Sequence, residues 1–175
     1  MDMNRLIKIN TMIIFLFIIG CEDKADDSSS IVIREITTDN VSAGPYYFNL
    51  VTGEKDSTTW HLLYQNKKVP FGPSVYDMPN FSLDNGVMMA VDNSMKKFEE
   101  IEEAPSPSAF SPEGGRLQYE GSNAALLYDM QSHKVSTSTE NYYVYDTVTH
   151  KVFKIYFVEY SSGVVLFRYA ELPNK

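Results

Sequence analysis

Cysteine is nearly absent from this chain of 175 residues, which contains only Cys21. A single cysteine cannot form a disulfide within the chain, so the hydrophobic core must hold the fold together. Because 43% of the residues are hydrophobic and 13% are aromatic, the chain can bury a core large enough for one globular domain.

Basic residues and enzyme motifs are also scarce. The chain has 15 Lys and Arg against 23 Asp and Glu, a formal net charge of −8, which argues against a nucleic-acid partner because phosphate binding needs a basic surface. The G-x-S-x-G, H-E-x-x-H, P-loop and C-x-x-C patterns are missing. Since no nucleophile occurs with its base in a recognisable order, we expect a protein that is not an enzyme.

The N-terminus has the order of an export signal. Arg5 and Lys8 precede an uninterrupted apolar stretch at residues 12–19, which is short for a membrane-spanning helix and is followed by Gly20 and Cys21. The Ile-Ile-Gly-Cys ending resembles the signal of bacterial lipoproteins. That resemblance implies that residues 1–20 are a signal peptide and that Cys21 is acylated after cleavage; the alternative is a buried cysteine behind a membrane-anchor helix.

Acyl chains would hold the mature protein on a lipid bilayer without spanning it. Residues 21–30 are acidic and rich in serine, so we expect a disordered tether between the lipid and a domain at residues 31–175. The acidic start resembles the tethers of lipoproteins that some Gram-negative bacteria export to the cell surface. A plain solvated spacer explains the same composition.

The strongest structural pattern lies near the C-terminus. Residues 142–145, 151–160 and 164–170 alternate β-branched and aromatic side chains, which predicts three strands with turns at 146–150 and 161–163. Both faces carry bulk, so we expect cover on both sides, with Lys154 near an edge. Further strands are expected at 31–37, 46–51, 58–64, 74–78, 87–91, 124–128 and 135–140.

These patterns predict an all-β fold, a single domain rich in antiparallel sheet with long loops. Pro70, Gly72, Pro73 and Pro79 predict loops around a short strand at 74–78, and residues 106–121 predict a long surface loop. The only tryptophan, Trp60, lies close to the aliphatic residues Leu62 and Leu63 and is expected in the core.

The order of several short motifs resembles the HmuY-like haem-binding lipoproteins. The resemblance covers most of the domain and is strongest over its last 50 residues. The matching residues are Tyr47-Phe48, Thr52-Gly53, Trp60, Leu62, Tyr128-Asp129, His133, 142–144, 151–160, Gly163 and Phe167-Arg168-Tyr169-Ala170.

This resemblance implies an all-β lipoprotein on the outer surface of the bacterial outer membrane, held to the lipid bilayer through Cys21. Such a protein captures haem for iron acquisition and passes it to a TonB-dependent outer-membrane receptor. Members of the family hold the iron with two His or two Met side chains from loops on either side of the ring.

Haem iron accepts imidazole nitrogen or thioether sulfur, and the porphyrin needs apolar and aromatic walls. The candidate ligands in this chain are His133, Met78, Met130, His61 and Met88.

Position along the chain separates these candidates. His133 follows Met130 in a turn and matches the family's histidine, although a turn histidine that holds backbone fits equally well. His61 follows Trp60 on a strand, so the two face opposite sides and His61 is expected to face solvent. One of Met88 and Met89 is expected in the core, and His150 is expected to be exposed in a turn.

Two functions therefore stand. The first is a haem-binding surface lipoprotein. The second is a surface structural or adhesion lipoprotein that has the same β fold and no ligand, since a fold does not fix a function.

Overall fold

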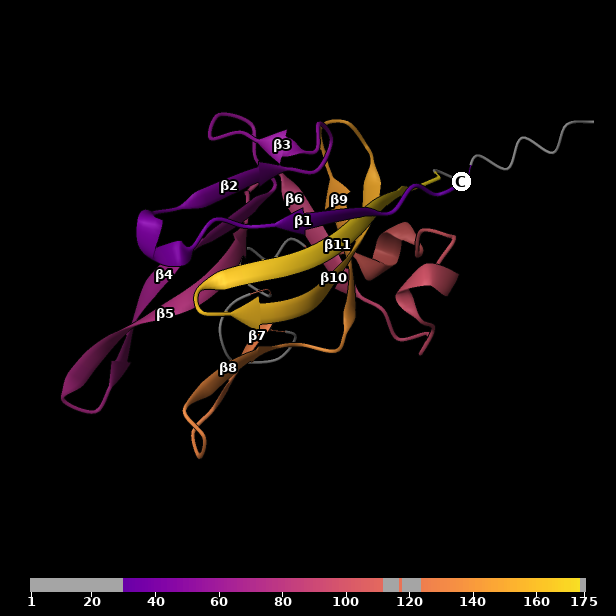
Figure 1. Ribbon diagram of the computed structural model, residues 1–175. Coiled ribbons are helices and arrows are strands. Elements are labelled where there is room, and N and C mark those ends of the chain that lie inside the picture. The colour runs from indigo at the N-terminus through magenta and orange to yellow at the C-terminus, as the bar shows by residue number, and fades with distance from the viewer. Residues whose placement is uncertain (1–29, 112–116, 118–123, 174–175) are drawn as a thin grey trace, which may run out of the picture.

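The computed structural model describes residues 30–111, 117 and 124–173, and these form an all-β domain of antiparallel sheets (Figure 1). Within these ranges no helix has the length and apolarity needed to cross a membrane. The expected signal peptide, Cys21 and all but the last residue of the expected tether lie outside the described residues.

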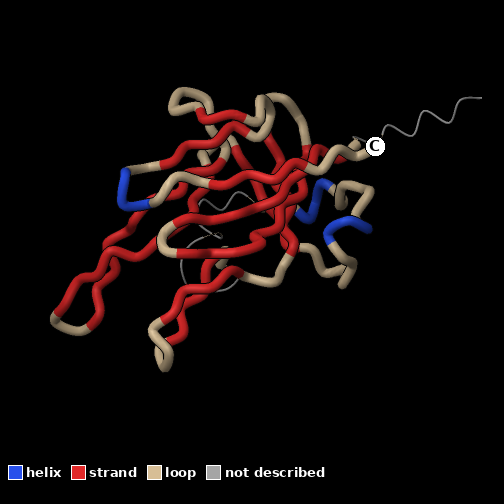
Figure 2. The backbone as a smooth tube through the Cα atoms, viewed as in Figure 1, coloured by secondary structure: helices blue, strands red, loops and turns tan. Residues whose placement is uncertain are grey.

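The described strands form three sheets, in the orders β1-β11-β10-β9-β6, β3-β2-β4-β5 and β7-β8. Most of the domain is strand, and its helical segments are single turns (Figure 2). The elements are β1 (Arg34–Thr37), η1 (Val41–Ala43), β2 (Tyr46–Asn49), β3 (Glu54–Lys55), β4 (Leu62–Phe71), β5 (Ser74–Leu83), β6 (Val87–Val91), η2 (Phe98–Glu100), η3 (Pro107–Ala109), β7 (Leu126–Asp129), β8 (Lys134–Thr137), β9 (Asn141–Asp146), β10 (Val152–Ser161) and β11 (Val164–Leu172).

The core lies between the five-stranded and four-stranded sheets. Tyr64 and Phe81 of the smaller sheet stack with their ring centroids 4.7 Å apart, and Phe81 meets Phe157 of β10 at 4.8 Å. Phe157 in turn packs on Tyr142 and Phe167 from the strands on either side of β10. Ring pairs of this kind add about 0.5–1.5 kcal/mol each beyond the area they bury, so aromatic side chains join the two layers.

The three C-terminal strands are confirmed as β9, β10 and β11. The edge position expected for Lys154 is wrong, because β10 lies in the middle of its sheet and Lys154 is 1% exposed. Its Nζ donates hydrogen bonds to the carbonyl oxygens of Phe98 at 2.7 Å and Ile101 at 2.8 Å. The turn η2 covers this face of the sheet, and its carbonyl oxygens need a buried donor.

A long hairpin replaces the loops expected around residues 69–79. β4 and β5 pair over ten positions, from Leu62 with Leu83 to Phe71 with Ser74. Proline is tolerated because β5 is an edge strand and the outer half of β4 has β5 as its neighbour on one side alone. Gly72, with φ 59°, begins the tight turn.

Trp60 is half-buried rather than in the core. It precedes β4 and meets the ring of Tyr47 edge-on at 5.5 Å. The β4–β5 and β7–β8 hairpins both project from the body of the domain (Figure 1), and the outer half of β4 is largely exposed. The chain therefore presents two hairpin ends to solvent.

Candidate functional site: a pocket between two hairpins

An open pocket of about 260 Å³ lies between the β4–β5 and β7–β8 hairpins. Its lining is mostly apolar and aromatic and includes three of the five predicted ligands. The lining residues are Val69, Pro70, Phe71, Tyr76, Met78, Tyr128, Met130 and His133.

One wall of the pocket is a single face of the β4–β5 hairpin. Val69 is paired with Tyr76 across the strands, and Phe71 and Met78 lie on the same face two residues away along β4 and β5. Phe71 and Tyr76 are 57% and 53% exposed, with ring centroids 6.5 Å apart. Exposed apolar side chains gathered at one place are typical of ligand-binding grooves and of protein or membrane interaction surfaces.

The other wall is the turn between β7 and β8. The Asp129 carboxylate accepts hydrogen bonds from the Gln131 amide and the Ser132 hydroxyl, which closes the turn. These bonds, those of Ser132 first, hold the pKa of Asp129 below its usual range. His133 occupies the left-handed region, with φ 53°, a conformation in which histidine is several-fold enriched.

Tyr128 holds the ring of His133. The Tyr128 hydroxyl lies 2.7 Å from Nδ1 of His133, which leaves Nε2 as the nitrogen that can bind a metal. In metal sites, a hydrogen bond at the second ring nitrogen fixes the tautomer and the orientation of a ligating histidine. Tyr128 is one of the residues that carry the family resemblance, but its contact with His133 is a finding of the structure.

Two methionines complete the set of soft donors. Met78 comes from β5, and Met130, which is 56% exposed, comes from the β7–β8 turn. Thus the structure brings His133, Met78 and Met130 together from segments about 50 residues apart in the sequence.

Basic residues flank this pocket although the chain as a whole is acidic. Lys67 is the cross-strand partner of Met78 and therefore lies on the face that forms the wall. Lys68 lies on the opposite face of β4, where it pairs with Asp77 at 3.3 Å. Lys134 directly follows His133. A flat ligand with carboxylate groups at its edge would find the Lys67 ammonium group on this face.

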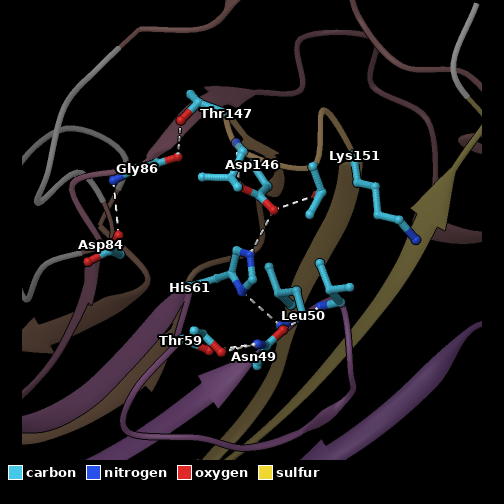
Figure 3. A network of polar contacts seen from close by, with 12 residues as sticks. Asn49, Leu50, Thr59, His61, Asp84, Gly86, Asp146, Thr147 and Lys151 are labelled. Atoms are coloured by element: carbon cyan, nitrogen blue, oxygen red, sulfur yellow. Dashed lines mark hydrogen bonds and ion pairs between the residues drawn. The ribbon is translucent and has the colours of Figure 1, made fainter.

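His61 lies elsewhere and is 7% exposed, so the expectation that it faces solvent is wrong (Figure 3). Its Nδ1 accepts the backbone N–H of Leu50 at 3.1 Å, and its Nε2 lies 3.3 Å from a carboxylate oxygen of Asp146. Through these two contacts the His61 imidazole joins Leu50, which follows β2, to Asp146 at the end of β9. We therefore leave His61 out of the proposed site.

Asp146 is the acidic end of this network. Burial, the largest single influence, raises the pKa of its carboxyl, but hydrogen bonds from Thr149, the Val148 amide and His61 outweigh burial and leave the pKa below its usual range. The ionised carboxylate is thus the form that the fold favours.

Met88 lines a different pocket, together with His150. The neighbouring Met89 is fully buried in the core, which confirms that one of the two methionines is a core residue. His150 is exposed in its turn as expected. Met88 is consequently separate from the pocket that contains His133.

The aromatic wall and the contact of Tyr128 with His133 were not predicted from the sequence. The prolines of residues 70–79 predict loops, and a loop does not place Val69, Phe71 and Tyr76 on one face. A signal for Tyr128 does exist: residues 128–135 and 145–152 share the pattern Y-D-x-x-(S/T)-H-K-V, at an offset shorter than the repeats usually sought.

No family model, no curated protein and no solved structure matches this chain. Among residues 30–111, 117 and 124–173, no three His, Cys, Asp or Glu side chains gather as a site for a metal ion. The donors that do gather, one imidazole and two thioethers, are of the kinds that ligate haem iron. Aromatic side chains of β4 and β5 stand beside these donors, and Lys67 lies on the same face of the hairpin.

Proposed function

We propose that this protein is a lipid-anchored haem-binding protein of the bacterial cell surface, which captures haem for iron acquisition. The observation that carries the proposal is the convergence of Met78, from β5, with Met130 and His133, from the β7–β8 turn, on one apolar pocket. The resemblance to HmuY-like lipoproteins supports the same function independently of the pocket.

The donors and the aromatic residues of the pocket have separate roles in this proposal. His133 would ligate the iron through Nε2, with its Nδ1–H donating to Tyr128, and Met78 or Met130 would supply a thioether. Val69, Phe71 and Tyr76 would pack on the porphyrin, and Lys67, on the same face of the hairpin, would supply a cation for a propionate. Haem, when bound, would supply an iron that accepts imidazole nitrogen and thioether sulfur.

The pocket is open, and its walls belong to projecting hairpins. A volume of about 260 Å³ is below the roughly 300–1,000 Å³ of pockets that enclose a small molecule. A haem held there would keep one edge in solvent. That arrangement suits a protein that passes its ligand to an outer-membrane transporter, which by the family resemblance is a TonB-dependent receptor.

The alternative, a structural or adhesion lipoprotein without a ligand, would present a flat apolar patch. Here the exposed aromatic side chains of β4 and β5 line a pocket that also contains a histidine and two methionines. That grouping favours ligand binding over adhesion.

Hemin titration of the chain from residue 22 onward tests haem binding. We expect a shifted Soret band on the wild-type protein, and about tenfold weaker binding in His133→Asn and in one of Met78→Leu and Met130→Leu. Asparagine is chosen because it tolerates the positive φ of residue 133 and so preserves the turn. Met95→Leu is the control, because Met95 is 98% exposed and lines none of the pockets described above. An unchanged hemin spectrum at micromolar protein would overturn the proposal.

Replacement of Cys21 tests the anchor. In an export-competent bacterial host, the wild-type chain should incorporate labelled palmitate and sediment with membranes, and Cys21→Ser should do neither. Equal labelling of the two proteins would refute acylation at this residue.

A further inference from the structure

We infer that the domain has a second site for a flat, apolar iron chelate of the porphyrin class, built on the turn between β9 and β10. His150 and Met88 are its iron ligands, and both line a pocket of about 610 Å³. The ligand class rests on the proposed function, whereas the existence of the pocket does not.

The first argument is a duplicated turn. Residues 128–135 read Y-D-M-Q-S-H-K-V and residues 145–152 read Y-D-T-V-T-H-K-V, so five of eight positions are identical and one exchanges Ser for Thr. The first copy joins β7 to β8 and supplies His133 to the pocket described above. The second copy joins β9 to β10 and ends in His150, Lys151 and Val152.

The two copies have the same local geometry. Asp146 accepts hydrogen bonds from the Val148 amide and the Thr149 hydroxyl, as Asp129 does two and three residues ahead in its own turn. His150 has φ 59°, against 53° for His133. The Tyr145 hydroxyl lies 2.7 Å from Nδ1 of His150, which again leaves Nε2 for a ligand.

A methionine accompanies the histidine in this pocket too. Met88 of β6 is the direct cross-strand partner of Tyr145, so the two side chains lie next to each other on one face of the five-stranded sheet. Val152 is paired with Tyr145 from the other side. The row from Met88 through Tyr145 to Val152 forms an apolar floor across three strands, and His150 lies at the turn beside it.

The segment after η2 forms the facing wall. Pro105, Pro107 and Phe110 line the pocket, and the Phe110 ring lies 5.5 Å from the Tyr145 ring. The volume of about 610 Å³ falls within the range of sites that hold a small organic molecule. An aromatic, proline-rich pocket with one imidazole and one thioether suits an apolar metal chelate better than a bare ion or a sugar.

Stoichiometry of hemin binding tests this site. The wild-type domain should bind two equivalents of hemin. His150→Asn and Met88→Leu should each lose the equivalent at the β9–β10 turn or bind it about tenfold more weakly. His133→Asn should lose the equivalent at the β7–β8 turn. Asparagine again preserves a residue with positive φ, and circular dichroism with Trp60 fluorescence checks folding. The double variant His133→Asn/His150→Asn should bind none specifically. Iron-free protoporphyrin should bind with little difference between His150→Asn and wild type.

The outcomes separate the two sites. A single equivalent that is lost in His133→Asn and kept in His150→Asn overturns the second site and leaves the proposed function standing. A single equivalent that is lost in His150→Asn and kept in His133→Asn supports the β9–β10 site and overturns the assignment of His133. An absence of binding overturns both.

Discussion

Lys154 makes the sharpest stability prediction, because a lysine that is 1% exposed in the middle of a sheet has a specific task. Its ammonium group donates to the carbonyl oxygens of Phe98 and Ile101 and lies 4.5 Å from the centre of the Phe98 ring. Phe98 and Ile101 are themselves 4% and 2% exposed. Lys154 thus holds the η2 turn against the sheet, and we expect Lys154→Met to release it.

The size of the effect follows from two opposing contributions. A buried acceptor that loses its partner costs about 1–3 kcal/mol, and two are lost here. Burial of the Lys154 ammonium group has the opposite effect on stability. Burial is the largest influence on the pKa of Lys154 and lowers it, despite the opposing effect of Glu99. The folded state therefore disfavours the charged ammonium group, and methionine removes this cost because it carries no charge. The difference leaves a net loss of about 2 kcal/mol in the free energy of unfolding.

Urea unfolding followed by the fluorescence of Trp60 measures this loss. With a slope of about 2 kcal/mol per molar urea, the midpoint should fall by about 1 M. The control is Lys55→Met, since the ion pair of Lys55 with Asp39 is exposed and its removal should cost about 0.5 kcal/mol or less. Equal midpoints for Lys154→Met and the wild type would refute the argument, as would an equal loss in the control.

Two further substitutions probe other parts of the fold. The depressed pKa of Asp146 contributes stability that is present above the unfolded value of 3.8 and is lost as the pH falls through the folded pKa. Asp146→Asn should therefore lower the urea midpoint at pH 7, by a margin that narrows below about pH 4; a margin independent of pH would contradict this. Gly163 has φ 88°, and a Cβ added there would lie 2.9 Å from the Asn40 amide oxygen. Gly163→Ala should therefore lower the free energy of unfolding by about 1–2 kcal/mol. Gly72→Ala, where a Cβ meets nothing within 4 Å, should cost less in the same assay, and equal losses would exclude the contact.

The strands that could be predicted are those rich in β-branched and aromatic side chains. β10 and β11 are central to their sheet, so β-branched and aromatic residues on both faces marked them in the sequence. β5 was predicted at half its length, because Pro79 is read as a break until the topology shows that the strand is an edge.

Three of the candidate ligands line one pocket, but the side chains around them could not be predicted. Met78 and His133 could be chosen because thioether and imidazole groups are recognisable in any sequence. Their juxtaposition depends on two hairpins folding toward each other, which no local pattern encodes. The burial of His61 could not be predicted. Its partners Leu50 and Asp146 lie elsewhere in the sequence, and its neighbours on the strand do not indicate them.

Both ends of the described chain lie at one place, since Ser30 and Pro173 line the same pocket. The hairpin ends point to the opposite side of the molecule (Figure 1). A surface sensor that immobilises the domain through its N-terminus should therefore leave the β4–β5 and β7–β8 hairpins open to an injected analyte. A fluorescent protein fused at residue 175 would be carried on the immobilised side and would not crowd them.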